Sequence, residues 1–291
     1  AHERVAAAED RLLAHDKRIT ALEDGVVIPE PEEPPTGEQP KPWDGGRVGA
    51  AKAITVPDRW ERVSTPESLR DALRSGFSVM LIERQRLGGF EFEIADGAWV
   101  AAEGAGAWVF GNGSDPVFRP RGRGCAHNLV IEGLNRGSTN EDGVKGDGSC
   151  DYWLDKCALR LVHDEQIDLW DTGKKRLTVT RSALLGDDGR EFGPLMGRRS
   201  GSTQTVDLWL TMWRTYVETA SRHPRVGAPG AVAHLVNTVH AWWWAGAPIA
   251  IDVAEGGVAI LEGPIFGRDN VGGGVGAGVS NAPGGVYVSD V

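Results

Sequence analysis

The chain has 291 residues and a formal net charge of −10, and its basic residues form no long run, so no nucleic-acid partner is expected. Glycine accounts for 40 residues, about twice its usual share of roughly 7%, which favours a turn-rich β architecture over a helical bundle. The longest nearly uncharged apolar run, 241–251, is far shorter than the roughly 20 residues of a membrane span, so membrane insertion is not expected either.

Residues 1–24 predict a short coiled coil. Its seam positions recur at alternating intervals of three and four: Val5, Ala8, Leu12, His15, Ile19 and Leu22. The segment 18–23 resembles the Arg-apolar-x-x-apolar-Glu pattern of trimeric coiled coils, in which Arg18 bridges to Glu23 of a neighbouring chain. Three heptads are marginal as a single helix, so a homotrimer is expected. An ordinary solvated amphipathic helix is the alternative.

Residues 25–45 form a proline-rich, acidic segment that predicts an extended linker without a core of its own. Its prolines are Pro29, Pro31, Pro34, Pro35, Pro40 and Pro42. A stalk, a spacer and a globular head at 46–267 together are typical of a virion appendage.

The head is expected to open with one short helix. Thr65 is a good N-cap, and Pro66 suits the first helical position. Leu69 and Leu73 give a buried face, and Gly76 is expected to end the helix.

Short apolar strands separated by Gly, Asn and Asp turns are expected after this helix. They fall at 78–83, 128–134, 151–157, 177–182, 207–213, 232–238 and 257–263. From the second of these strands onward the pattern recurs about every 25 residues, which is typical of a β-solenoid, whereas an immunoglobulin-like sandwich would turn every 8–12 or so. The longer step after 177–182 indicates an inserted loop. The glycine-rich segment 268–291 is consistent with a cap, an inter-chain contact or a flexible tail.

Three cysteines are too few for a disulfide scaffold, and an odd number cannot all form pairs. Cys125, Cys150 and Cys157 are expected to be small buried thiols, with a Cys150–Cys157 bridge as the alternative.

Several motifs across residues 64–267 resemble those of the pectate lyase family, in the same order. They are Asp142-Gly143-Val144, Trp153-Leu154-Asp155-Lys156-Cys157, Asp164 and Asp168 four residues apart, Leu195-Met196-Gly197, Arg222-x-Pro224 and His234-x-x-Asn237. The resemblance implies an all-β fold: a single-stranded right-handed parallel β-helix with an N-terminal capping helix.

The resemblance also implies a site. Asp142, Asp164 and Asp168 would be calcium ligands, since calcium prefers several hard carboxylate oxygens. Arg222 would be the catalytic base of a β-elimination that removes the C5 proton of a uronic acid in an acidic polysaccharide. Solvated loop acids and a structural arginine are the corresponding alternatives.

Three further residues are candidates for binding the sugar. Arg225 and Arg198 would pair with carboxylates of the polymer, and Trp170, two residues beyond Asp168, would stack on a sugar ring. Most of the 11 tryptophans, including the run 242–244, are expected to pack in the protein or against other chains.

The chain departs from the family pattern at the catalytic positions. The second family arginine falls at Gly227, and the family lysine falls at Phe192. The asparagine ladder is also thinned, with Cys157, Ser182 and Thr238 at ladder-like positions. These departures leave enzymatic activity open while the fold stays expected.

The architecture predicts a bacteriophage tail fibre or tailspike-like protein of the virion that binds, and by the lyase hypothesis cleaves, an acidic polysaccharide of the host cell surface. Its expected partners are two further copies of the chain and other phage tail proteins. A catalytically inactive receptor-binding or structural tail component is the alternative. A free secreted pectate lyase is disfavoured by the stalk and by the lack of a visible leader.

Overall fold

The computed structural model describes residues 56–134, 137–170, 173–186, 192–198, 205–219, 221–241, 251–266, 277–279 and 285–289. The predicted coiled coil of 1–24 and the linker of 25–45 lie outside the described residues, so both stay predictions. The tryptophan run at 242–244 also lies outside them.

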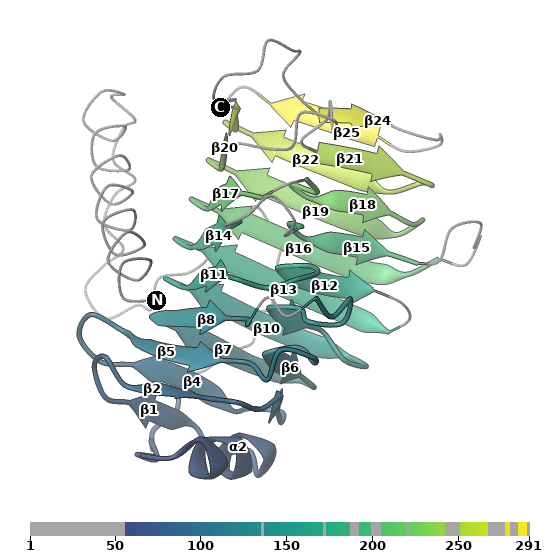
Figure 1. Cartoon of the computed structure of the whole chain (residues 1–291). Helices are drawn as coiled ribbons and strands as arrows, with labels where there is room; N and C mark the ends of the chain where they lie inside the picture. Colours follow the sequence, from purple (N-terminus) through teal and green to yellow (C-terminus); the bar gives the residue numbers. More distant parts are fainter. Residues whose placement is uncertain are drawn as a thin grey trace. The chain divides into compact units, whose positions relative to one another are not determined.

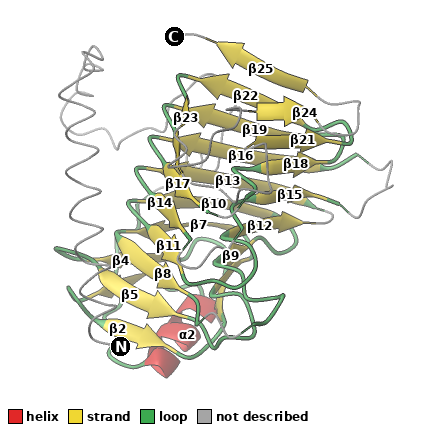
Figure 2. Ribbon diagram, turned by 45° about the horizontal axis from the view of Figure 1, so that its top comes forward, coloured by secondary structure: helices red, strands yellow, loops and turns green. Residues whose placement is uncertain are grey.

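The first described helix, α2 (Pro66–Arg74), begins and ends as its sequence predicts. The Thr65 hydroxyl oxygen accepts a hydrogen bond from the Ser68 peptide N–H at 3.2 Å, which satisfies one of the unpaired donors of the first turn. Leu69 and Leu73 are fully buried. Both side chains belong to the hydrophobic core. The helix lies at the end of the stacked strands that starts with β1 (Val79–Leu81), as Figure 1 shows, and Figure 2 shows the same helix from another direction.

The chain then runs through three parallel sheets, contributing one strand to each in turn (Figure 1). The first sheet contains β1, β4 (Trp99–Ala102), β7 (Arg123–His127), β10 (Cys150–Asp155), β13 (Lys174–Thr180), β16 (Asp207–Trp213), β19 (Ala231–Val236), β22 (Val258–Glu262) and β25 (Gly285–Ser289). The second contains β2 (Arg86–Gly88), β5 (Ala107–Phe110), β8 (Leu129–Glu132), β11 (Ala158–Arg160), β14 (Ala183–Leu185), β17 (Tyr216–Glu218), β20 (Val239–Ala241) and β23 (Ile265–Phe266). The third contains β3 (Phe92–Ile94), β6 (Phe118–Pro120), β9 (Val144–Lys145), β12 (Ile167–Trp170), β15 (Leu195–Gly197), β18 (Arg225–Gly227), β21 (Ile251–Ala254) and β24 (Ala277–Val279).

Strands that follow one another within a sheet pair in parallel along its length, which defines a single-stranded parallel β-helix. The predicted β-solenoid is therefore confirmed for the described residues. Within the glycine-rich C-terminal segment, β25 pairs with β22 and β24 pairs with β21, so both strands extend existing sheets.

One predicted strand belongs to a different sheet from the one its spacing suggested. The strand predicted at 128–134 corresponds to β8 of the second sheet, whereas the other recurring strands lie in the first. The first-sheet strand in that coil is β7, whose second residue, Gly124, hides the apolar pattern. A Cβ at Gly124 would collide with the Ala98 carbonyl oxygen and lie 2.7 Å from the Tyr152 ring, so the close packing of the neighbouring coils leaves room only for glycine.

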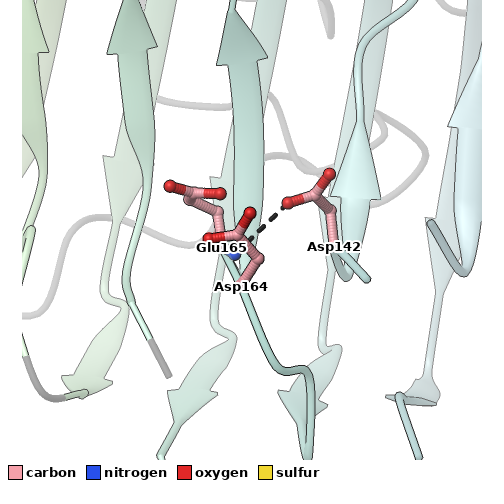
Figure 3. A group of neighbouring side chains, drawn as sticks. All are labelled: Asp142, Asp164 and Glu165. Carbon is pink, nitrogen blue, oxygen red and sulfur yellow. Dashed lines mark hydrogen bonds between the residues drawn. The ribbon is translucent and has the colours of Figure 1, made fainter. Parts of the chain in front are cut away.

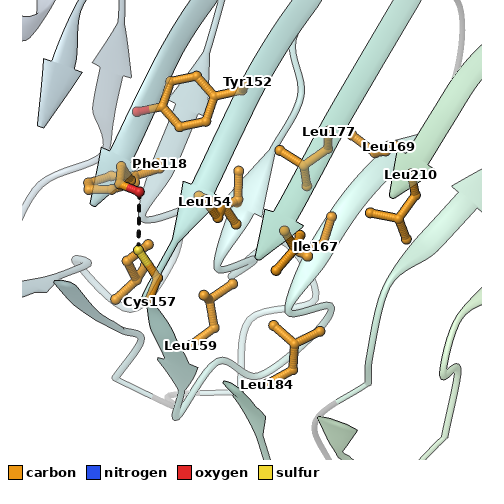
Figure 4. Packing of buried hydrophobic residues seen from close by; sticks show 14 of the residues in the cluster. Phe118, Tyr152, Leu154, Cys157, Leu159, Ile167, Leu169, Leu177, Leu184 and Leu210 are labelled. Carbon is orange, nitrogen blue, oxygen red and sulfur yellow. Dashed lines mark hydrogen bonds between the residues drawn. The ribbon is translucent and has the colours of Figure 1, made fainter. Parts of the chain in front are cut away.

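The core is a continuous column of inward-facing side chains (Figure 4). On the first sheet, Tyr152 pairs in register with Leu177, and Leu177 with Leu210, and all three are buried. Stacking across neighbouring coils removes these side chains from water. Full burial of a leucine side chain stabilises the folded state by about 1.5–3 kcal/mol.

The corner between the first and second sheets repeats one backbone conformation from coil to coil. Asn128, Lys156, Arg181, Arg214 and Asn237 all adopt positive φ there, between 48° and 59°.

The residue after the corner is buried in all five coils, and from the second of them onward it is small: Cys157, Ser182, Thr215 and Thr238. The Ser182 hydroxyl accepts from the Cys157 peptide N–H at 3.0 Å and donates to the Thr180 carbonyl oxygen at 2.8 Å. Cys157, Ser182 and Thr238, expected at ladder-like positions, are all buried at this corner.

The three cysteines are free and buried, as the sequence predicts. Burial raises the pKa of the Cys157 thiol to about 12, so it stays protonated near neutral pH. Within the described part of the chain, no helix is long and apolar enough to cross a membrane.

Candidate functional site

The third sheet carries a row of mostly charged residues at neighbouring positions. Lys145 of β9 pairs in register with Asp168 of β12, and Asp168 with Leu195 of β15. The row continues to Arg225 of β18 and Asp252 of β21. Because neighbouring parallel strands lie about 4.8 Å apart, charges far apart in sequence become adjacent in space.

The bends leading into these strands align a second set of side chains. The Gly143 peptide N–H, next to Asp142, donates to the Glu165 carbonyl oxygen at 2.9 Å. Isolated parallel bridges then join Glu165 to Phe192 and Phe192 to Ser221, the residue before Arg222. The predicted acids and the predicted arginine therefore approach one another across successive coils.

Three carboxylates meet at these bends (Figure 3). Asp142, Asp164 and Glu165 each offer an oxygen within 4.8 Å of the others. The Glu165 peptide N–H donates to Asp142 Oδ1 at 3.2 Å, which holds the two bends together. The chemistry of this group suits a hard cation, and it could hold a metal ion.

The predicted calcium ligands Asp142 and Asp168 are already joined by a lysine. Lys145 Nζ lies 2.9 Å from Asp142 Oδ2 and 2.6 Å from Asp168 Oδ2. The two carboxylates are nearly buried, with side-chain exposures of 1% and 6%. Calcium binds oxygen ligands at about 2.3–2.6 Å, so an ion between these two acids would take the place of the ammonium. The Asp142 and Asp168 pair therefore does not fit calcium with Lys145 where it is.

Protonation in this cluster follows from burial. Desolvation, assisted by the neighbouring Asp168 carboxylate, raises the pKa of Asp142 to about 7. Desolvation also raises the pKa of Asp164, although Arg222 acts in the opposite direction. For Lys145, burial alone would lower the pKa, but the carboxylates of Asp168 and Asp142 raise it overall.

Arg222 is held between an acid and an aromatic ring. It forms an ion pair with Glu165, and its guanidinium carbon lies 4.2 Å from the centre of the Phe192 ring. Its backbone has φ of 62°, in the left-handed region. Burial lowers the pKa of Arg222, although Asp164 opposes the shift.

The other predicted sugar-binding residues lie along the third sheet. Arg225 Nε is 3.6 Å from Asp252 Oδ2, and its side chain is 41% exposed. Trp170 stands two residues after Asp168 on β12, so the two side chains point to the same face of the sheet. On the neighbouring strand β15, Trp170 pairs in register with Gly197. A Cβ at Gly197 would lie 3.3 Å from the indole. Arg198 follows β15 directly, beside Gly197.

Two functional candidates escaped the sequence prediction. Lys145 stands three residues after Asp142, and only the register of β9 with β12 shows that it reaches Asp168 as well. Glu165 is the immediate neighbour of Asp164, but its pairing with Arg222 depends on the bridge through Phe192. The sequence offered one usable signal, namely that Glu165 lies inside the acidic motif.

No protein-family model and no curated protein matches this chain. Several solved structures share its fold. An alginate lyase from Paenibacillus sp. str. FPU-7 superposes with a TM-score of 0.60 at 15% identity, covering 80% of this chain and 99% of that one. Jun a 1, the major allergen of cedar pollen, superposes with a TM-score of 0.57 at 16% identity, covering 78% and 76%.

A pectate lyase from Paenibacillus sp. 0602 has a TM-score of 0.55 at 13% identity, covering 84% of this chain and 87% of that one. At these identities the similarity defines a class of fold, the parallel β-helix of pectate and alginate lyases, and leaves the activity to be argued from the residues.

Proposed function

We propose that this protein binds an acidic polysaccharide at the Arg222 site and cleaves it by β-elimination. The observation that carries the proposal is the placement of a largely buried arginine against a group of carboxylates that Lys145 also contacts, on a fold shared with two proteins described as alginate and pectate lyases. Cationic side chains along the third sheet, such as the partly exposed Arg225, suit the carboxylates of a polyuronate.

In this reaction the Arg222 guanidine, in its neutral form, takes the C5 proton of a uronic acid. The C5–H electron pair forms the C4–C5 double bond, and the C4–O bond to the neighbouring sugar breaks. The departing oxygen takes a proton from water. In water, arginine is almost entirely protonated at neutral pH, so very little of it is in the form that can accept a proton. The lowered pKa of Arg222 raises the share of neutral guanidine and so favours this role.

The test is the ultraviolet absorbance of the unsaturated product with polygalacturonate or alginate as substrate. Arg222→Ala is expected to lower the rate by at least about a hundredfold, as expected for loss of a general base. Arg214→Ala is the matched control, because Arg214 also has positive φ and lies 4.9 Å from an aromatic ring, that of Trp213. Equal rates in wild type and Arg222→Ala would remove Arg222 from the chemistry.

Binding without cleavage is the second candidate function. Phe192 stands where the family pattern has a lysine, and Gly227 where it has a second arginine. This candidate is supported if the protein is retained on a polyuronate affinity column but releases no unsaturated product.

The resemblance to pectate lyases also implies bound calcium. A calcium-bound site is therefore the alternative to the site occupied by Lys145 and Arg222. An ion at Asp142, Asp164 and Glu165 would compete with Lys145 and Arg222 for the same oxygens.

At the level of the whole chain, we propose a bacteriophage tail fibre or tailspike-like protein of the virion. Residues 1–24 would assemble three chains, and α2 would cap the N-terminal end of a right-handed β-helix. The head would then meet a host cell-surface polysaccharide, with other phage tail proteins as its virion partners. The heptad pattern of 1–24 and the proline-rich spacer of 25–45 support this layout.

A further inference from the structure

Lys145 is fixed between two acids by the strand register itself. It is the in-register partner of Asp168, and it follows Asp142 by three residues around the bend into β9. Both contacts are within hydrogen-bonding distance, and both carboxylates are almost completely removed from water. The position of the ammonium is therefore set by backbone pairing and needs no bound ligand.

Two buried carboxylates this close need a cation between them. Like charges in a low-dielectric site repel strongly, and an unpaired buried carboxylate is costly. In the described structure this charge is supplied by Lys145, which binds both acids at once. The ammonium makes a third, longer contact: its Nζ lies 3.5 Å from Asn140 Oδ1, at the limit of a hydrogen bond.

We propose that Lys145 is a built-in cation that takes the place of a metal ion between Asp142 and Asp168, making this site independent of calcium. The inference deepens the proposed function, on which its relevance to polyuronate binding rests. With 30% of its side chain exposed, Lys145 also offers a fixed positive charge to the carboxylate of a bound acidic sugar.

The experiment measures calcium binding to the full chain by titration calorimetry, together with the melting temperature in calcium and in chelator. The variants are Lys145→Met, which keeps the apolar stem and removes the charge, and Lys145→Arg, which keeps the charge. Lys145→Met/Asp168→Asn is the control that also removes one acid.

Wild type and Lys145→Arg are expected to show no saturable calcium binding up to about 1 mM, the weak end of protein calcium sites, and the same melting temperature in calcium and chelator. Lys145→Met should melt lower in chelator, recover in calcium, and bind calcium at least about tenfold more tightly than wild type. The double variant should lose this binding.

Calcium binding by wild type as tight as by Lys145→Met would overturn the inference, as would a Lys145→Met protein that neither binds calcium nor loses stability. If Lys145→Met folds only when calcium is present, that rescue supports the inference of a built-in cation. If it folds under neither condition, the wild-type melting temperature decides, because stabilisation of wild type by calcium contradicts a built-in cation.

These readouts do not require turnover. A protein that cleaves no polysaccharide would refute the proposed elimination while leaving the calcium measurements valid. If cleavage occurs, a chelator should leave its rate unchanged.

Discussion

The protonation state of a buried residue in this protein depends on whether hydrogen bonds offset the cost of removing its charge from water. Asp155 is 1% exposed yet stays ionised, because hydrogen bonds from His127, Arg181 and Thr180 outweigh desolvation and hold its pKa below the ordinary value. His223, next to Arg222, shows the opposite result. Burial lowers its pKa to about 4, and its Nε2 lies 3.0 Å from the Thr219 carbonyl oxygen.

The depressed pKa of His223 predicts acid sensitivity. Above the unfolded value of about 6.5 this group does not affect stability, because it is neutral in both states. As the pH falls from about 6.5 to 4 the unfolded chain takes up the proton first, so folding should lose about 3 kcal/mol from this residue. Urea titrations at several pH values measure the loss.

His223→Gln is the control for the acid prediction. Its amide can still donate to Thr219 but does not titrate, so the fall in stability between pH 6.5 and 4 should be smaller than in wild type. His240 lies with its ring centre 5.8 Å away, and its pKa is lowered by burial too, so some acid sensitivity should remain. An unchanged slope in His223→Gln contradicts the prediction.

At the scale of the element, the corner between the first and second sheets shows how one coil is tied to the next. The Ser182 hydroxyl connects Cys157 of the preceding coil to Thr180 of its own. The equivalent buried positions of later coils are Thr215 and Thr238. From Ser182 onward, three successive coils therefore have a small side chain with a hydroxyl at this corner.

Ser182→Ala should lower the free energy of unfolding by about 1–3 kcal/mol, because it leaves the buried Cys157 N–H without its acceptor. Ser182→Thr keeps the hydroxyl and should remain closer to wild type. Chemical denaturation of both variants measures the difference. Equal stability of the two would show that the hydroxyl is unimportant at this corner.

The elements also show how far sequence patterns reach. The capping residue Thr65 and the apolar strand β16 were predicted with their correct roles because each depends on local chemistry. Strand β7 was missed as the first-sheet member of its coil. Its Gly124 is required by the Ala98 carbonyl oxygen and the Tyr152 ring of the neighbouring coils, and sequence spacing carries no record of those contacts.

At the scale of the whole molecule, the predicted assembly depends on residues 1–24. Three heptads supply a seam that a single helix cannot bury, so the full chain should be a trimer in solution. Removing 1–24 should give a monomeric head with an unchanged β-sheet circular dichroism spectrum. Sedimentation equilibrium measures the mass of each form, and a monomeric full chain or a trimeric truncated chain would contradict the prediction.

The sequence by itself determined the solenoid, because its period of about 25 residues and its ordered motifs depend on local apolar and turn chemistry repeated along the chain. It also named Asp142, Asp164, Asp168 and Arg222, which do converge. Only the tertiary structure placed Lys145 between two of those acids and Glu165 against Arg222. The reason is physical: which side chains touch across coils is set by strand register, and register depends on packing among residues that the sequence keeps far apart.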